Sequence, residues 1–155
     1  MKKLFFSLIA FCMLSVSTKA QSDAELTNFF QTLFGMERQE LVESFITPSV
    51  ENSPAFWEIY DAYEVDRKEL DKKGLTLLKK YVDSYGNTTD EETNEIVDEM
   101  RSSVKSRNKL IDKYYKKIRK INAVDAGAFY QIESFIAAQT RVKVLKGIPF
   151  FGEFD

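Results

Sequence analysis

The sequence contains no histidine, and its one cysteine, Cys12, lies within the first 20 of 155 residues. Histidine is the most frequent general acid–base in enzymes, and cysteine and histidine are the usual zinc ligands. Beyond residue 20 the chain therefore cannot form a disulfide, use thiol chemistry or build a zinc site of the usual kind. A glycine-rich phosphate loop and a nucleophile elbow are also missing. These absences favour a non-enzymatic protein without a cofactor.

Long apolar runs are scarce too, and the one present lies at the N-terminus. Lys2 and Lys3 precede an apolar run over residues 4–16, which ends in small residues and Lys19 before Ala20. This order is typical of a secretory signal peptide, and we expect cleavage after Ala20. The apolar run of about 13 residues is shorter than the roughly 20 that span a bilayer as a helix. The sequence thus predicts a periplasmic or secreted protein with a signal peptide over residues 1–20, one domain over 21–155 and no stable membrane anchor.

Positive charge is in slight deficit. Removing Lys2, Lys3 and Lys19 from the 22 basic residues leaves 19 against 24 acidic ones, a net charge of −5. Proteins that bind nucleic acids usually present a basic face. We therefore expect no nucleic-acid partner.

The sequence has abundant helical periodicity, with start and stop signals between the periodic segments. Ser53 and Pro54 form a helix start, and Thr89 with Glu92 has the spacing of a capping box. Gly35 is a candidate break in the first segment. The pattern predicts an all-α fold of four helical segments built on a long antiparallel hairpin, with the segments at about residues 23–46, 54–85, 90–121 and 125–146.

The two long central segments carry apolar stripes that can be paired. In the first, the stripe comprises Phe56, Tyr60, Tyr63, Arg67, Leu70, Gly74, Leu77 and Tyr81. In the second, it comprises Val97, Met100, Val104, Arg107, Ile111, Tyr114 and Ile118. A turn centred on Asn87 pairs the stripes layer by layer, as antiparallel helices require.

This register places Arg67 and Arg107 at one level. Two like charges inside a bundle need compensating carboxylates, solvent or an anion. Glu64 and Asp71 lie one turn to either side of Arg67, and Glu133 or Gln139 of the last segment could provide a partner for Arg107. One interpretation is a polar layer that fixes the register, and the other is an anion or ligand site. An enzymatic alternative would have to use carboxylates such as Glu64 with Asp71, or Glu133 alone.

The C-terminal segment carries three phenylalanines beyond the last predicted helix: Phe150, Phe151 and Phe154. We expect this segment to fold back against the first helix. The alternative is a tail whose aromatic side chains bind a partner protein.

Several segments together resemble a known family. They are the signal peptide, the sequences at residues 55–63 and 129–133, the Thr-x-x-Glu turn at residues 89–92, and the closing segment at 141–149. Their order is similar to that of small exported bacterial helical proteins distantly related to the Spy/CpxP periplasmic stress proteins. The hallmark Leu-Thr-x-x-Gln of that family reads Thr88-Thr89-Asp90-Glu91-Glu92 here. The resemblance implies ATP-independent chaperone activity or restraint of an envelope-stress sensor, through a helical surface that is often dimeric.

Two functional hypotheses follow. The first is an exported helical binding protein, chaperone-like or accessory to the envelope-stress response, which binds protein clients. The second is a non-enzymatic regulatory or structural protein with one dedicated envelope partner. The aromatic content suits either hypothesis, because thin helices with many aromatic residues can leave an apolar groove exposed.

Overall fold

The computed structural model describes residues 19–153, with side chains from residue 24 onward. Within this range the chain is all-α and contains no strand, which confirms the predicted fold class. The expected signal peptide lies almost entirely outside the described residues, although Ala20 falls in the first turn of α2. The helices are α2 (Lys19–Phe34), α3 (Arg38–Glu43), α4 (Ser53–Ser84), α5 (Asp90–Ile118) and α6 (Ala123–Gly147).

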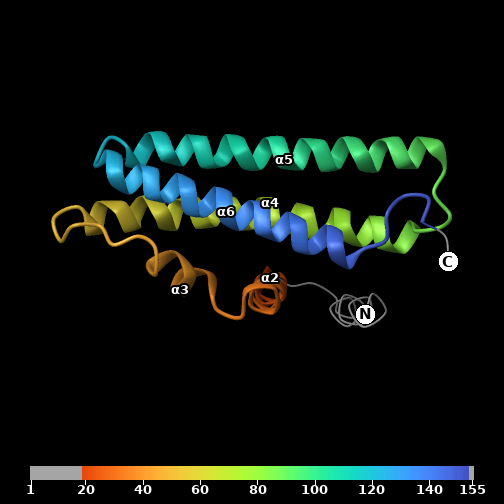
Figure 1. Cartoon of the computed structure of the whole chain (residues 1–155), viewed down its shortest axis with the longest axis horizontal. Coiled ribbons are helices and arrows are strands. Elements are labelled where there is room, and N and C mark those ends of the chain that lie inside the picture. The colour runs from red at the N-terminus through yellow and green to blue at the C-terminus, as the bar shows by residue number, and fades with distance from the viewer. Residues whose placement is uncertain (1–18, 154–155) are drawn as a thin grey trace.

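The hairpin of α4 and α5 is the longest feature of the molecule (Figure 1). α4 has Pro54 in its first turn, where the missing N–H costs no helical hydrogen bond. Gly86, at φ 80°, follows its end. α5 begins with a reciprocal capping box, in which the Glu92 N–H donates to the Thr89 hydroxyl and the Thr89 N–H to the Glu92 carboxylate. Local signals thus determine where the two long helices end and begin.

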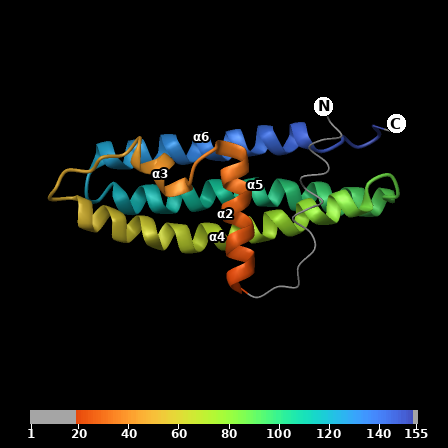
Figure 2. The ribbon, with the colours of Figure 1, turned by 90° about the horizontal axis from the view of Figure 1, so that it is seen from below.

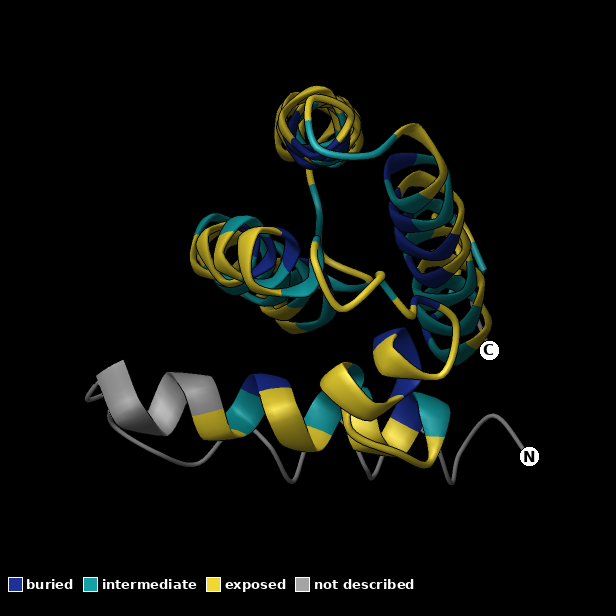
Figure 3. Cartoon of the chain, turned by 90° about the vertical axis from the view of Figure 1, so that its left-hand side faces the viewer, coloured by how far each residue is buried: buried dark blue, intermediate teal, exposed yellow. Residues whose placement is uncertain are grey.

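The first predicted helical segment is two helices. Gly35 adopts φ 75°, a left-handed conformation that glycine tolerates, and it separates α2 from α3. α2 then runs roughly perpendicular to the long helices instead of along them (Figure 2). Seen end-on, α4, α5 and α6 form a triangle, and α2 and α3 cover its side between α4 and α6 (Figure 3).

The main core fills this triangle and confirms the predicted stripe of α4. Phe56, Tyr60, Tyr63 and Arg67 are buried. Around them pack Leu41 and Val42 from α3, Ile111, Tyr114 and Ile118 from α5, and Phe129, Ile132 and Ile136 from α6. α3 therefore completes the core and is not a surface addition.

The predicted stripe of α5 holds only in its second half. Near the N-terminus of α5, Ile96 is fully buried, whereas Val97 and Val104 are partly exposed. The reason is a second apolar cluster, in which Ile96 contacts Leu77, Tyr81 and Ile148. The C-terminal segment reaches this end of the hairpin through Ile148, so the inward face of α5 here includes Ile96.

That segment does not fold against the first helix, so this expectation was wrong. The Tyr81 hydroxyl donates to the carbonyl of Pro149 at 2.6 Å, and the rings of Tyr81 and Phe151 pack edge to face at 4.9 Å. The tail therefore packs against α4, near the turn of the hairpin. Phe150 and Phe151 remain exposed, and Phe154 lies outside the described residues.

Candidate functional site

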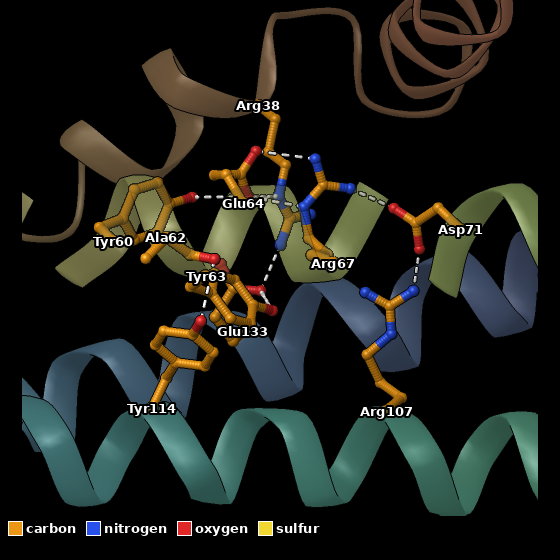
Figure 4. Close-up of polar contacts among 10 residues, drawn as sticks. All are labelled: Arg38, Tyr60, Ala62, Tyr63, Glu64, Arg67, Asp71, Arg107, Tyr114 and Glu133. Atoms are coloured by element: carbon orange, nitrogen blue, oxygen red, sulfur yellow. Dashed lines mark hydrogen bonds and ion pairs between the residues drawn. The ribbon is translucent and has the colours of Figure 1, made fainter. Parts of the chain in front are cut away.

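Glu133 lies at the centre of a polar network between α3, α4 and α6 (Figure 4). It is 1% exposed and faces the core from α6. Arg38, the first residue of α3, makes an ion pair with its Oε2, and the Tyr63 hydroxyl donates to the same oxygen at 2.5 Å. Glu133 Oε1 has no hydrogen-bond partner among the described residues. The carboxylate is thus held from two sides by groups that neutralise or solvate it.

The network continues along α4. Arg67 donates to both oxygens of Glu64, at 2.6 and 2.7 Å, and also pairs with Asp71. Asp71 accepts a second ion pair from Arg107 of α5. Glu64 in turn accepts from Nε of Arg38 at 3.1 Å. Three carboxylates and three arginines therefore alternate along a path from α6 through α3 and α4 to α5.

The pKa shifts agree with this alternation. Burial alone would lower the pKa of Arg38, but the Glu133 carboxylate together with Tyr60, Tyr63 and Glu64 outweighs burial and raises this pKa. Burial would raise the pKa of Glu64, yet the hydrogen bonds and charge of Arg67 lower it. Burial and the Glu133 carboxylate both raise the pKa of Tyr63, so its hydroxyl stays a donor. For Arg107 burial prevails and lowers the pKa.

The structure brings Arg67 and Arg107 together on one shared carboxylate, Asp71, as their predicted common level requires. It does not make Glu133 the partner of Arg107, because Glu133 pairs with Arg38 instead. The side chain of Gln139 forms no hydrogen bond in the part of the chain that the structure describes. Since carboxylates already pair the arginines, the geometry favours a polar layer that fixes helix register over an anion site.

Arg38 is the residue of the network that the sequence pattern did not reveal. It begins a helix of six residues, too short for a periodic signal. The available signal was indirect: Glu133 lies on a helix face with Phe129 and Ile136, and a buried carboxylate requires a cation. Nothing in the sequence says that this cation comes from 95 residues away.

A second feature is an open apolar hollow of about 280 Å³ on the opposite side of α6. Phe45, in the loop after α3, forms one wall and Phe135 of α6 another, with Ala128, Gln131 and Ile132 completing the lining. Phe45 is 61% exposed and Phe135 48%. Large aromatic side chains at this level of exposure, gathered around one hollow, are typical of a protein-binding surface.

Within the described residues no cluster of three or more acidic side chains is placed to hold a metal ion. None of the helices described there combines the length and apolar character that a membrane crossing requires. The polar network and the apolar hollow are two features of the described residues that have functional potential.

Comparison of the chain with protein-family models, with curated proteins and with solved structures finds no match.

Proposed function

We propose that this chain is an exported helical binding protein that holds apolar segments of other proteins without nucleotide, in the manner of an envelope chaperone or stress accessory. The observation that carries the proposal is the uncovered aromatic surface around Phe45 and Phe135. Keeping such side chains in contact with water is unfavourable in free energy, and burying them against a client would be favourable. The N-terminal pattern of residues 1–20 supports the exported location.

The rigid interior supports this reading. The buried polar groups between α3 and α6 largely satisfy one another, with Glu133 Oε1 as the exception in the network. They are therefore poorly suited to chemistry on a substrate. A scaffold of this kind can keep aromatic side chains exposed without collapsing around them. The surface, and not the interior, is then where the protein acts.

The test is suppression of aggregation. A chemically denatured test protein is diluted into buffer with or without the purified protein, and light scattering is followed without nucleotide. We expect scattering to fall at stoichiometric ratios. The double variant Phe45→Ser/Phe135→Ser should lose most of this effect, whereas Val65→Ser, at an exposed apolar position on α4, should retain it. No suppression by the unmodified protein would refute the proposal.

A single dedicated partner is the alternative, and the small size of the hollow favours this alternative. Crosslinking in cells, followed by mass spectrometry, distinguishes a dedicated partner from a chaperone-like function. One dominant envelope protein that disappears with the Phe45→Ser/Phe135→Ser variant would support the dedicated partner. A broad set of captured proteins would support the chaperone-like function.

A further inference from the structure

The outer face of α6 carries a stripe of mostly apolar residues at a strict helical spacing. The stripe comprises Val124, Ala128, Gln131, Phe135, Ala138 and Val142, separated by four, three, four, three and four residues. Val124 is 78% exposed and Val142 45%, and Gln131 and Ala138 are also exposed. The opposite face of the same helix, with Phe129 and Glu133, is buried in the core. α6 therefore has a second face suited to packing, and most of that face stays exposed within the chain, although Ala128 also packs against the core.

The order of the spacings is the same when it is read from either end. Two copies of α6 placed antiparallel about a twofold axis at the level of residue 133 would align Val124 with Val142 and Ala128 with Ala138. Gln131 would face Phe135 at the two central layers. Each layer then appears twice, with residue i of one copy facing residue j of the other and the reverse, as an isologous interface requires. No charged residue belongs to the stripe, so no charge repulsion within it opposes this contact.

The shape of the surface supports the same arrangement. The hollow, which is lined by Phe45, Ala128, Gln131, Ile132 and Phe135, lies beside Gln131, the residue that Phe135 of the second copy would face. By symmetry, Phe135 of the first copy would enter the hollow of the second. We infer that the outer face of α6 binds the same face of a second copy of this chain in antiparallel orientation.

This interface should be weak. The stripe extends about 27 Å at 1.5 Å per residue, and one helix pair of that length falls at the low end of stable interfaces. We expect a micromolar dissociation constant. The second copy and a client would compete for Phe135, so client binding should decline as the protein concentration rises. The dimer itself does not depend on the proposed client binding.

Cysteine substitution tests the orientation, with Cys12→Ser as the background so that every thiol is an introduced one. The double variant Val124→Cys/Val142→Cys should form a disulfide-linked dimer under mild oxidation, and so should a mixture of the two single variants. Each single variant alone should remain monomeric, like the control Val65→Cys on α4. Crosslinking of the single variants at the level of the double variant would indicate a parallel or random encounter and overturn the inference.

Sedimentation equilibrium provides an independent measure on the processed protein as purified from cells. Phe135→Lys should raise the dissociation constant at least tenfold, whereas Val65→Lys should leave it unchanged. Circular dichroism checks that both variants keep their helical content. A protein that stays monomeric at hundreds of micromolar would overturn the dimer, and the aggregation assay would still decide the client-binding function separately.

Discussion

α5 and α6 pack along each other inside the same bundle, yet their outer faces are built differently. Fourteen of the 29 residues of α5 are charged, against five of the 25 residues of α6. The outside of α5 presents ion pairs such as Arg101 with Asp98, whereas the outside of α6 presents Phe135 and Val142. A helix that meets water needs a polar outer face. α5 therefore forms a boundary with solvent, while α6 is suited to a further protein contact.

The largest expected difference lies between the two faces of α6 itself. Phe129→Ala removes a fully buried ring and should lower the free energy of unfolding by about 4 kcal/mol. Phe135→Ala should cost about 1 kcal/mol or less when the protein is dilute enough to be monomeric. Urea denaturation followed by circular dichroism measures both values. Equal losses would mean that the outer face is already covered within one chain, and the comparison would fail.

The inward polar contact of α6 should be the next most sensitive. Arg38→Met leaves the Glu133 carboxylate buried without its cation and should cost about 3 kcal/mol. The matched change on the outside of α5, Arg101→Met, removes an exposed pair and should cost less than about 0.5 kcal/mol. Denaturant unfolding of both variants tests this contrast. Adding Glu133→Leu to Arg38→Met should recover part of the loss, and a further loss would contradict the ion-pair explanation.

The starts of the two helices should respond alike. Thr89→Ala removes the capping box of α5, and Asn122→Ala removes the side chain that accepts from the N–H groups of Val124 and Asp125 at the start of α6. Each change should lower stability by about 1 kcal/mol. Thermal unfolding of the two variants measures both losses of stability. Similar losses would leave the outer faces as the main difference between the helices. A loss confined to one helix would show that the start of the other helix is held by other contacts.

The smallest effect is expected from acid. The Arg67 hydrogen bonds lower the pKa of Glu64 below its ordinary value of 4.5, so its contribution is fully present above about pH 4.5 and is lost as the pH falls through the lowered pKa. Stability should therefore decline below about pH 4.5, and less steeply in Glu64→Gln. Denaturation midpoints between pH 6 and pH 3 measure how the free energy of unfolding depends on pH. The number of protons taken up on unfolding should differ between the two proteins by on the order of one per molecule. Identical slopes would exclude Glu64 from the pH response.

Much of the fold could be predicted from periodicity. The predicted stripe of α4 is buried or half-buried at each of its eight positions, because a helix in the middle of a bundle has one dominant core face. The start signals at Ser53–Pro54 and Thr89 placed the starts of α4 and α5 within one residue, although Ser53 lies inside α4 and Asn52 takes the cap position without a side-chain bond. The rotation of α5 near Ile96 could not be predicted, since it depends on where the C-terminal segment packs.

The site was less predictable, for a physical reason. The pairing of Arg67 and Arg107 through Asp71 follows from hairpin register, which is a local property of two stripes. The pairing of Arg38 with Glu133 joins distant segments, and a single arginine in a six-residue helix has no pattern to announce it. The hollow beside Phe45 depends likewise on how a loop passes α6.

The distance along the chain between Arg38 and Glu133 also sets the order in which the molecule can be assembled. The hairpin of α4 and α5 can close as soon as its two arms exist, because its contacts begin at a short turn. α3 must wait for a partner that is made 95 residues later. Until then Leu41 and Val42 have no complete core to pack into. Docking of the N-terminal helices should therefore be the final step of folding, and the newly made chain should be most prone to aggregation just before this step.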